Sequence, residues 1–366
     1  MSARHYLRPI ALAESPQSED GGVVRLAGGL AYASRFAVIA RDNGRIVSRE
    51  LYSASELRAM MPDLSPELQV QFADLQRAHA PLQCGARTVR LDQPQVMGIL
   101  NITPDSFSDG GQFMDDPEIA AAHAADMLKG GAAIIDIGGE STRPGAAAVW
   151  EGDELKRVVP MVERLAASGA VISIDSRRPA VMEAALAAGA HILNDVSALR
   201  HDPRSLEFAA RSGAPVVLMH APGEGDDLHS GGNYADVVLD VFDWLAGRRD
   251  AAIAAGVARE KIVLDPGIGF GKSVADNLAL MNALPLFHAL GQPLLVGVSR
   301  KRMIGALSGE APAHQRLGGS IMLATKALEA GVQLLRVHDV PETVQALRVW
   351  RGLRDAALTD FSQLAS

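Results

Sequence analysis

Residues 96–111 read VMGILNITPDSFSDGG and join an apolar run to a polar loop. The run 96–100 ends at Asn101, and the residues after it are rich in Thr, Ser, Asp and Gly, with one aromatic residue, Phe107. A single segment of this kind is most often a buried strand followed by a surface turn. The same pattern recurs seven more times before the C-terminus. We therefore interpret residues 96–111 as the first unit of a repeated architecture.

The repeated units alternate strand and helix. The apolar runs lie at 96–100, 132–137, 171–174, 191–193, 216–219, 262–264, 294–298 and 334–337. The helical segments that follow them begin near Pro117, Asp153, Pro179, Pro203, Tyr234, Ala275, His314 and Pro341. Eight such pairs favour an α/β protein, a closed (β/α)8 TIM barrel. The alternative is a doubly wound open sheet, which usually carries a Gly-rich dinucleotide motif at its first turn, and none is present there.

The composition narrows the class of protein. The 366 residues carry a net charge of −8, whereas nucleic-acid-binding proteins usually show a basic face. Cys84 is the only cysteine, so one chain can form neither a disulfide nor a cysteine-based zinc site. No uncharged apolar run approaches the roughly 20 residues that span a bilayer, and the N-terminus lacks an apolar signal core. We expect a cytoplasmic globular protein without nucleic-acid or membrane partners.

The N-terminal quarter lacks the repeated pattern. We predict an N-terminal extension over residues 1–90 and the barrel over residues 91–366. Residues 1–22 are poor in apolar groups and are expected to be loose, with order beginning near Val23. Residues 36–52 read as a β-hairpin around Asn43-Gly44, and 55–61 and 66–79 read as helices, the second capped by Ser65. No catalytic constellation is evident in this extension.

Each apolar run of the barrel ends in polar residues. In chain order these are Asn101, Glu140, Asp175, Asn194, His220, Asp265, Ser299 with Lys301, and His338 with Asp339. Any one of them is most often a helix cap or a turn residue. In a TIM barrel, however, the carboxyl ends of all strands meet at one rim, and active sites lie there. We therefore predict that these residues form one site.

Arg336 and His338 lie two residues apart in the last strand, LLRVHDV. Alternate residues of a strand point to the same side, so the guanidinium and the imidazole would face the same space. Both groups bind phosphate oxygens well. This pair predicts an anion site.

Residues 262–273, IVLDPGIGFGKS, look at first like a phosphate-binding P-loop. That motif needs a Gly where Pro266 stands, so the interpretation fails. The segment instead presents Asp265 at a strand end, followed by glycines that permit close approach of a ligand. A carboxylate there can accept two parallel hydrogen bonds from a flat heterocycle with adjacent N–H and amino groups. Asp175 and Asn194 add polar groups nearby.

Residues 138–145, GGESTRPG, form a loop rich in Gly and Pro that carries Ser141, Thr142 and Arg143. Such a loop is long enough to fold over a ligand and exclude water. Arg143 is equally well explained as a solvated surface charge. We interpret this loop and residues 101–111 as two lids.

These motifs, taken in order, resemble the dihydropteroate synthase family. The matching segments are NITPDSFSDGG, GGESTRPG, SIDS, ILNDVSA, LMH, DPGIGFGK, GVSRK and RVHDV, which span residues 95–350. The resemblance implies a transferase that joins 6-hydroxymethyl-7,8-dihydropterin diphosphate to p-aminobenzoate, releasing diphosphate and forming 7,8-dihydropteroate. It also implies a Mg²⁺ cofactor and a homodimer.

The resemblance assigns a role to each motif residue. Asp175, Asn194, Asp265 and Lys301 correspond to pterin contacts. Asn101, Arg336 and His338 correspond to the diphosphate and Mg²⁺ end, with Asn101 as the metal ligand. Phe107, Thr142, Arg143, Pro144 and Ser299 correspond to positions around p-aminobenzoate, and Met219, Gly269 and Phe270 to the pocket walls. Asp175, Lys301, Arg143 and Asp265 are the implied catalytic residues.

The resemblance also implies a dissociative reaction in which diphosphate leaves before the arylamine attacks. One segment departs from the family pattern: residues 221–232 read APGEGDDLHSGG, and we expect a flexible acidic loop there. Two alternatives remain. A corrinoid-linked methyltransferase would share Asp175, Asn194 and Asp265 but would not need the two lids, and a non-catalytic pterin-binding homologue would have lost lid residues.

Overall fold

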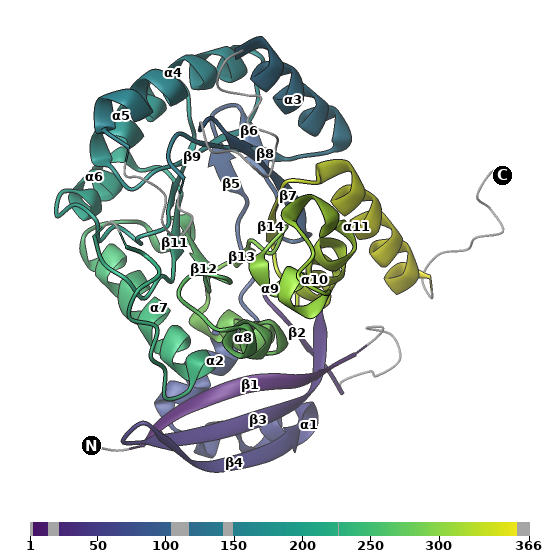
Figure 1. Ribbon diagram of the computed structural model, residues 1–366. Coiled ribbons are helices and arrows are strands. Elements are labelled where there is room, and N and C mark those ends of the chain that lie inside the picture. The colour runs from purple at the N-terminus through teal and green to yellow at the C-terminus, as the bar shows by residue number, and fades with distance from the viewer. Residues whose placement is uncertain (1–2, 14–21, 104–116, 142–148, 226, 357–366) are drawn as a thin grey trace.

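The computed structural model describes residues 3–13, 22–103, 117–141, 149–225 and 227–356. Eight parallel strands form one sheet in the order β12-β11-β10-β9-β8-β7-β14-β13, and a parallel bridge between Leu264 and Leu294 joins its two ends. The strands are β7 Gln95–Asn101, β8 Ile134–Gly138, β9 Ile172–Asp175, β10 Ile192–Asp195, β11 Val216–Met219, β12 Ile262–Asp265, β13 Leu295–Val296 and β14 Leu334–Val337. Figure 1 views this barrel along its axis. The predicted TIM barrel is confirmed.

Helices surround the barrel (Figure 1). They are α3 Pro117–Gly130, α4 Glu151–Ala167, α5 Pro179–Ala187, α6 Ser205–Ser212, α7 Val237–Ala254, α8 Val274–Phe287, α10 Leu317–Glu329 and α11 Val340–Asp355. Each begins within a few residues of its predicted start. A short helix that we did not predict, α9 (Arg302–Leu307), lies between β13 and α10. Single turns of 3-10 helix occupy Met61–Asp63, Arg259–Lys261, His288–Leu290 and Ala313–Gln315.

A small hairpin closes the amino end of the barrel. Its strands, β5 (Leu82–Cys84) and β6 (Arg87–Val89), are antiparallel. Leu82, Cys84 and Val89 pack with apolar residues from the barrel strands in one buried cluster. The hairpin falls on the extension side of the predicted boundary, yet it packs against the barrel. Side chains therefore fill this end of the barrel, and the polar residues of the strands lie at the opposite, carboxyl end.

The rest of the N-terminal region forms a small α+β unit. It contains β2 (Val24–Arg25), β3 (Tyr32–Asp42), β4 (Arg45–Ser53), α1 (Ala54–Met60) and α2 (Pro66–Leu75). The predicted hairpin is confirmed, with positive φ at its turn, 47° at Asn43 and 79° at Gly44. Both predicted helices are present, and the Ser65 hydroxyl accepts a hydrogen bond from the Leu68 N–H. The second helix ends at Leu75, four residues before the predicted end.

The expectation of a loose tail over residues 1–22 was wrong for its first half. Residues Arg4–Leu12 form β1, which pairs antiparallel with β3. Tyr6 and Leu7 are fully buried, and the Tyr6 hydroxyl donates a 2.8 Å hydrogen bond to Asp243 of α7. We missed this strand because we judged residues 1–22 by their average polarity. The residues that stabilise the strand lie in β3, outside that segment. Residues 14–21 lie outside the described part.

β1 also connects the N-terminal unit to the barrel. Gln71 of α2 binds the main chain of β1 through both ends of its amide, at 2.8 Å to the Leu7 N–H and 2.8 Å to the His5 carbonyl. Arg8 donates a 3.0 Å hydrogen bond to the carbonyl of Asn282 in α8. Figure 1 shows β1, β3 and β4 lying across the side of the barrel formed by α7 and α8. None of the helices in the described ranges has the length and apolar character needed to cross a membrane.

Candidate active site at the carboxyl ends of the barrel strands

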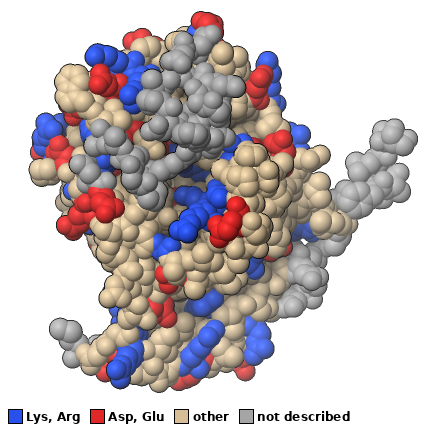
Figure 2. Space-filling view, viewed as in Figure 1, with Lys and Arg blue, Asp and Glu red and all other residues tan. Residues whose placement is uncertain are grey.

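The parallel register brings the predicted polar residues to one rim. Asn101 pairs with Gly138, Gly138 with Asp175, and Asp175 with Asn194 along successive strands. Met219 and Asp265 are likewise register partners. Figure 2 shows Lys and Arg side chains at the centre of the same end-on face, beside the grey segments. The strand ends therefore converge as expected for a site.

Arg336 is the centre of a buried ionic cluster. Its Nε donates a 2.6 Å hydrogen bond to Asp136, and its Nη2 donates a 2.7 Å hydrogen bond to Asp175. The Asn194 amide donates to the same Asp136 oxygen at 3.0 Å. The other Asp136 oxygen is buried and has no hydrogen-bond partner in the described ranges. Three strands, β8, β9 and β14, thus hold one guanidinium between two carboxylates.

Asp136 was not among the predicted site residues. It lies inside the apolar run 132–137, two residues before the loop 138–145. Its side chain is fully buried. A carboxylate that interrupts a buried strand needs a partner, so that single acidic residue in an apolar run was the available signal.

The charged groups of this cluster shift one another's pKa values. Burial raises the pKa of Asp175 to about 7, against the lowering effect of Arg336 and with a further raising effect from Asp136. Burial alone would lower the pKa of Arg336, but the charges of Asp136 and Asp175 outweigh it and raise that pKa. Arg336 therefore stays charged, with two of its three nitrogens already oriented by carboxylates. This arrangement presents the guanidinium to the rim in one fixed direction.

Asp265 and Lys301 form the second charged part of the site. The Asp265 carboxylate is 6% exposed and accepts a 2.7 Å hydrogen bond from the Gly267 N–H. Burial raises the pKa of Asp265 to about 6, although that hydrogen bond and the charge of Lys301 oppose the shift. Burial lowers the pKa of Lys301 to about 8, and the charge of Asp265 opposes that shift. A carboxylate and an ammonium with these values can both be ionised near neutral pH.

The loop after β12 shapes a wall beside Lys301. The Lys301 ammonium lies 4.6 Å from the centre of the Phe270 ring. Gly269 has a φ of +88°, and a Cβ there would lie only 3.1 Å from the Lys301 Cδ. Only glycine combines that backbone conformation with the space that the lysine needs. Gly269 and Phe270 therefore lie directly beside Lys301.

Lys272 holds this loop in place and was not predicted. Its buried ammonium donates to the carbonyls of Gly267 at 2.8 Å and Phe270 at 3.0 Å. It also lies 2.9 Å from Nδ1 of His220, at the end of β11. Burial lowers the pKa of Lys272 to about 7 and that of His220 to about 2. His220 is thus a neutral scaffold residue that ties β11 to the loop.

Met219 lies in an apolar cluster that also receives the loop 221–232. Met219, Val196, Ala221 and Leu228 are buried together, and Phe270 packs against them. His229 stacks on Phe270 with ring centres 5.0 Å apart, and its Nδ1 accepts a 3.3 Å hydrogen bond from the Gly271 N–H. The described part of the loop therefore folds onto the site and contributes His229, which sequence reasoning missed. We expected a flexible loop here, but these contacts attach its described residues to Phe270 and Gly271.

Other strand-end residues serve the scaffold. Glu140 accepts hydrogen bonds from Arg177 and Arg178, at 3.0 and 2.9 Å, inside the protein. Asp339 pairs with Arg300. Both form ion pairs with arginines, a role that differs from the helix cap or turn expected for a single strand-end residue.

Ser299 and His338 contact each other at the rim. The Ser299 hydroxyl lies 3.0 Å from His338 Nδ1 and accepts a 3.2 Å hydrogen bond from the His338 main chain. This contact connects the strand ends of β13 and β14 and fixes the position of the imidazole. The predictions for Phe107, Thr142, Arg143 and Pro144 fall outside the described residues.

Asn101 ends β7 next to Asp175. A Cβ on Gly138 would lie 3.4 Å from the Asn101 Oδ1 and 3.7 Å from an Asp175 carboxylate oxygen, so both oxygens border the same space. No group of three or more His, Cys, Asp or Glu in the described ranges could hold a metal ion. One amide oxygen suits a Mg²⁺ that takes most of its ligands from substrate phosphate and water. The described residues therefore fit a Mg²⁺ bound through Asn101, substrate phosphate and water. They do not fit a Mg²⁺ held by protein ligands alone.

Comparison with known proteins places this site in a family. Residues 97–338 match the family model described as pterin binding enzyme. A dihydropteroate synthase from Neisseria meningitidis serogroup B is 47% identical over 276 residues, covering 74% of this chain and 96% of the relative.

Solved structures give the same result. Xanthomonas albilineans dihydropteroate synthase with 4-aminobenzoic acid has 48% identity and a TM-score of 0.71, covering 76% of this chain and 99% of that one. The same enzyme in complex with 7,8-dihydropteroate has 46% identity and a TM-score of 0.68, covering 75% and 99% of the two chains.

Proposed function

This chain belongs to the pterin-binding enzyme family and, within it, to the dihydropteroate synthases, and we propose that the charged rim of its barrel carries out their reaction. It is a transferase of folate biosynthesis, which condenses 6-hydroxymethyl-7,8-dihydropterin diphosphate with p-aminobenzoate. The products are 7,8-dihydropteroate and diphosphate. The observation that carries the assignment of residues is the pair of charged clusters around Arg336 and around Asp265.

The pterin is proposed to bind between these two clusters. Asp265 is buried and keeps one oxygen free of the Gly267 hydrogen bond, so it can accept from the adjacent N–H and amino groups of the pterin edge. Lys301, beside the Phe270 ring, faces the same space and can donate to ring acceptors. Asp175 and Asn194 complete the polar contacts. Met219, Gly269 and Phe270 form the walls.

The diphosphate is proposed to bind at the end of β14. Arg336 supplies a guanidinium that Asp136 and Asp175 orient, and His338 supplies an imidazole that Ser299 holds. Asn101 would hold a Mg²⁺ through its amide oxygen, and the bound metal would neutralise charge on the departing diphosphate. Phe107, Thr142, Arg143 and Pro144, with Ser299, are proposed to surround p-aminobenzoate, a proposal that rests on their motifs alone.

The chemistry follows from where the charges lie. The C–O bond to diphosphate breaks first, and the electron-rich dihydropterin ring delocalises the cation left at its methylene carbon. Ionised Asp175 and Asp265 stabilise that cation, while Arg336 stabilises the departing anion; these groups are preorganised and hardly solvated. The arylamine nitrogen then forms the C–N bond and loses a proton to solvent. The site does bring one hydroxyl beside a base, Ser299 beside His338 Nδ1 at 3.0 Å, but a dissociative reaction needs no covalent intermediate on the protein.

A direct assay tests the assignment. Purified protein with the dihydropterin diphosphate and p-aminobenzoate should release diphosphate only when both substrates and Mg²⁺ are present. Chelation with EDTA should abolish the release, and added Mg²⁺ should restore it. Diphosphate release without p-aminobenzoate would indicate a hydrolase, and no release at all would support a non-catalytic pterin-binding protein. Unchanged turnover in EDTA would remove the metal from the proposal.

The shifted pKa values predict how pterin affinity depends on pH. We expect the affinity for a pterin without diphosphate to fall as the pH decreases from 8 to 5. Asp265 and Asp175, with pKa values of about 6 and about 7, become protonated in that range and lose acceptor capacity. Calorimetric titration at several pH values checks this. In Asp265→Asn the residual affinity should lack the step near pH 6, and an identical pH profile would contradict the assignment.

We further propose a homodimer that forms through α10 and α11. These helices pack side by side, and their outer surfaces expose Leu317, Met322 and Val349 at 39%, 64% and 57%. Exposed apolar patches of this kind usually mark interfaces. Met322→Glu should shift the sedimentation coefficient from dimer to monomer, whereas Glu329→Gln on the same helix should not. A monomeric wild-type protein would exclude the dimer.

A cytoplasmic location remains a proposal too. Cys84 is the only cysteine of the sequence, and its thiol is free and buried against the barrel strands. A protein without disulfides fits the reducing environment of the cytoplasm. Cell fractionation tests it.

A further inference from the structure

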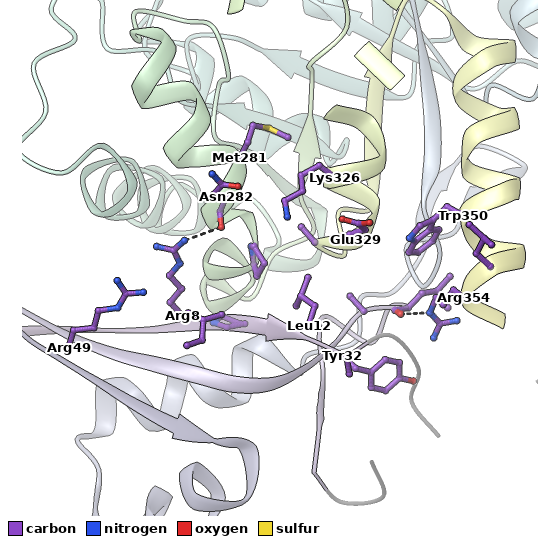
Figure 3. Close-up of a pocket in the computed structure, with 18 residues that line it drawn as sticks. Arg8, Leu12, Tyr32, Arg49, Met281, Asn282, Lys326, Glu329, Trp350 and Arg354 are labelled. Atoms are coloured by element: carbon purple, nitrogen blue, oxygen red, sulfur yellow. Dashed lines mark hydrogen bonds between the residues drawn. The ribbon is translucent and has the colours of Figure 1, made fainter. Parts of the chain in front are cut away.

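A cavity of about 690 Å³ lies between the N-terminal unit and the outer side of the barrel. Figure 3 shows β1 and its neighbouring strands on one side and the helices α8, α10 and α11 on the other. Its lining shares no residue with the candidate active site. Cavities of roughly 300–1,000 Å³ commonly bind small molecules. Its size therefore suits a ligand as large as a drug molecule.

The charges around this cavity are unbalanced. Four basic residues line it, Arg8, Arg49, Lys326 and Arg354, against one acidic residue, Glu329. Arg354 pairs with Asp355. For the other three basic residues, the described ranges offer no carboxylate within 4.0 Å. The walls of the cavity therefore carry more positive than negative charge.

Arg8 is the most informative of these residues. Its Nη2 donates to the Asn282 carbonyl at 3.0 Å, but its Nε is buried and has no hydrogen-bond partner in the described ranges. Burial and the nearby charge of Arg49 lower the pKa of Arg8, and the charge of Asp236 opposes this shift in part. Figure 3 shows the two guanidinium groups at the same end of the cavity. Two cations placed together, one with an unused buried N–H, are the arrangement that a bound anion stabilises.

Much of the remaining lining is apolar. Leu12 lies in its middle and Trp350 at the end opposite Arg8 (Figure 3). Met281 and Pro285, on α8, form part of the wall. A small inorganic anion would leave this apolar surface uncovered. A ligand that fills the cavity therefore combines an anionic group with a flat or apolar body.

We propose that this cavity is a binding site for an organic anion, with the acidic group between Arg8 and Arg49 and the apolar body over Leu12, Met281 and Pro285. The site is separate from catalysis in space. One wall comes from residues 8–13 and 30–32 and from Arg49, which lie outside the segment 97–338 that matches the family model. The N-terminal unit thus adds a binding function that the barrel alone does not have.

The probe for the test is 8-anilinonaphthalene-1-sulfonate, an aromatic sulfonate whose fluorescence rises in apolar surroundings. The full-length protein is titrated with it in the presence of saturating 7,8-dihydropteroate, which blocks the active site. Arg49→Glu and Lys326→Glu are each expected to weaken binding at least tenfold. Arg45→Glu is the matched control, since it makes the same charge change on the same strand, at an exposed residue outside the cavity lining. It should change the affinity less than twofold.

A neutral analogue tests the role of the anionic group. N-phenyl-1-naphthylamine has a similar aromatic body without the sulfonate, and we expect it to bind at least tenfold more weakly to wild type and equally to all the variants. Equal affinities of Arg49→Glu and Arg45→Glu for the sulfonate would overturn the proposal. Loss of all sulfonate binding when 7,8-dihydropteroate is added would do the same, because the probe would then occupy the active site.

Discussion

Asp265→Asn is expected to weaken pterin binding by roughly a hundredfold, equivalent to about 3 kcal/mol. The wild-type carboxylate offers acceptors only, to the Gly267 N–H and to the two donors of the pterin edge. An asparagine keeps the shape but places an NH₂ group where an acceptor is needed. One ligand donor is then left facing another donor in a buried place. Calorimetric titration with a pterin lacking diphosphate measures the loss.

The substitution should leave the fold intact, because an asparagine oxygen can still accept the hydrogen bond from Gly267. Asp250→Asn is a suitable control, since Asp250 lies at the surface of α7 and, among the described residues, pairs with Arg249 alone. Thermal melting should show both variants within a few degrees of wild type. If Asp265→Asn bound the pterin as tightly as wild type, Asp265 would not be a pterin contact.

The fold could be predicted because its signal is repeated. Each barrel strand is buried on both faces, so it reads as an apolar run, and each is followed by a helix of its own. The positions of Asp175, Asn194 and Asp265 followed from one rule, that the carboxyl ends of parallel strands share an edge. Their convergence in the structure depends on the parallel register of neighbouring strands.

Other features depend on contacts between residues that are distant in sequence, so the local sequence did not predict them. β1 is stabilised by β3, whose paired residues lie 21 to 37 positions later, and by Gln71, 64 positions after Leu7, so the polar composition around β1 was misleading. Asp136 is explained by its partners Asn194 and Arg336, 58 and 200 positions later. Lys272 looked like the end of a failed P-loop motif, although it binds carbonyl groups of its own loop.

Arg336 makes the largest expected contribution to stability within the site. Arg336→Met removes the cation that lies between Asp136 and Asp175 and leaves two carboxylates close together with little solvent. Breaking a buried ion pair in this way costs about 3–5 kcal/mol. The variant should therefore melt well below wild type and should show no measurable diphosphate release. Differential scanning calorimetry and the assay described above measure the two effects.

The pH dependence identifies the cause of the instability. The pKa of Asp175 is about 7 with Arg336 present, above the value of about 4 for an unfolded aspartate, so protonation favours the folded state. Stability is thus lost as the pH rises through that interval. Without Arg336 the pKa of Asp175 rises further and extends the loss to higher pH. The difference in melting temperature between Arg336→Met and wild type should be larger at pH 8.5 than at pH 6.

A second substitution separates stability from catalysis. Asp136→Asn in the Arg336→Met background removes one of the two buried negative charges, while its amide oxygen can still accept from Asn194. We expect this double variant to recover at least about 1 kcal/mol of the lost stability, because contacting residues couple strongly. It should remain inactive, since the guanidinium that would bind diphosphate is still missing. Recovery of turnover together with stability would mean that Arg336 only supports the scaffold, and the anion site would then have to rest on His338 and Asn101.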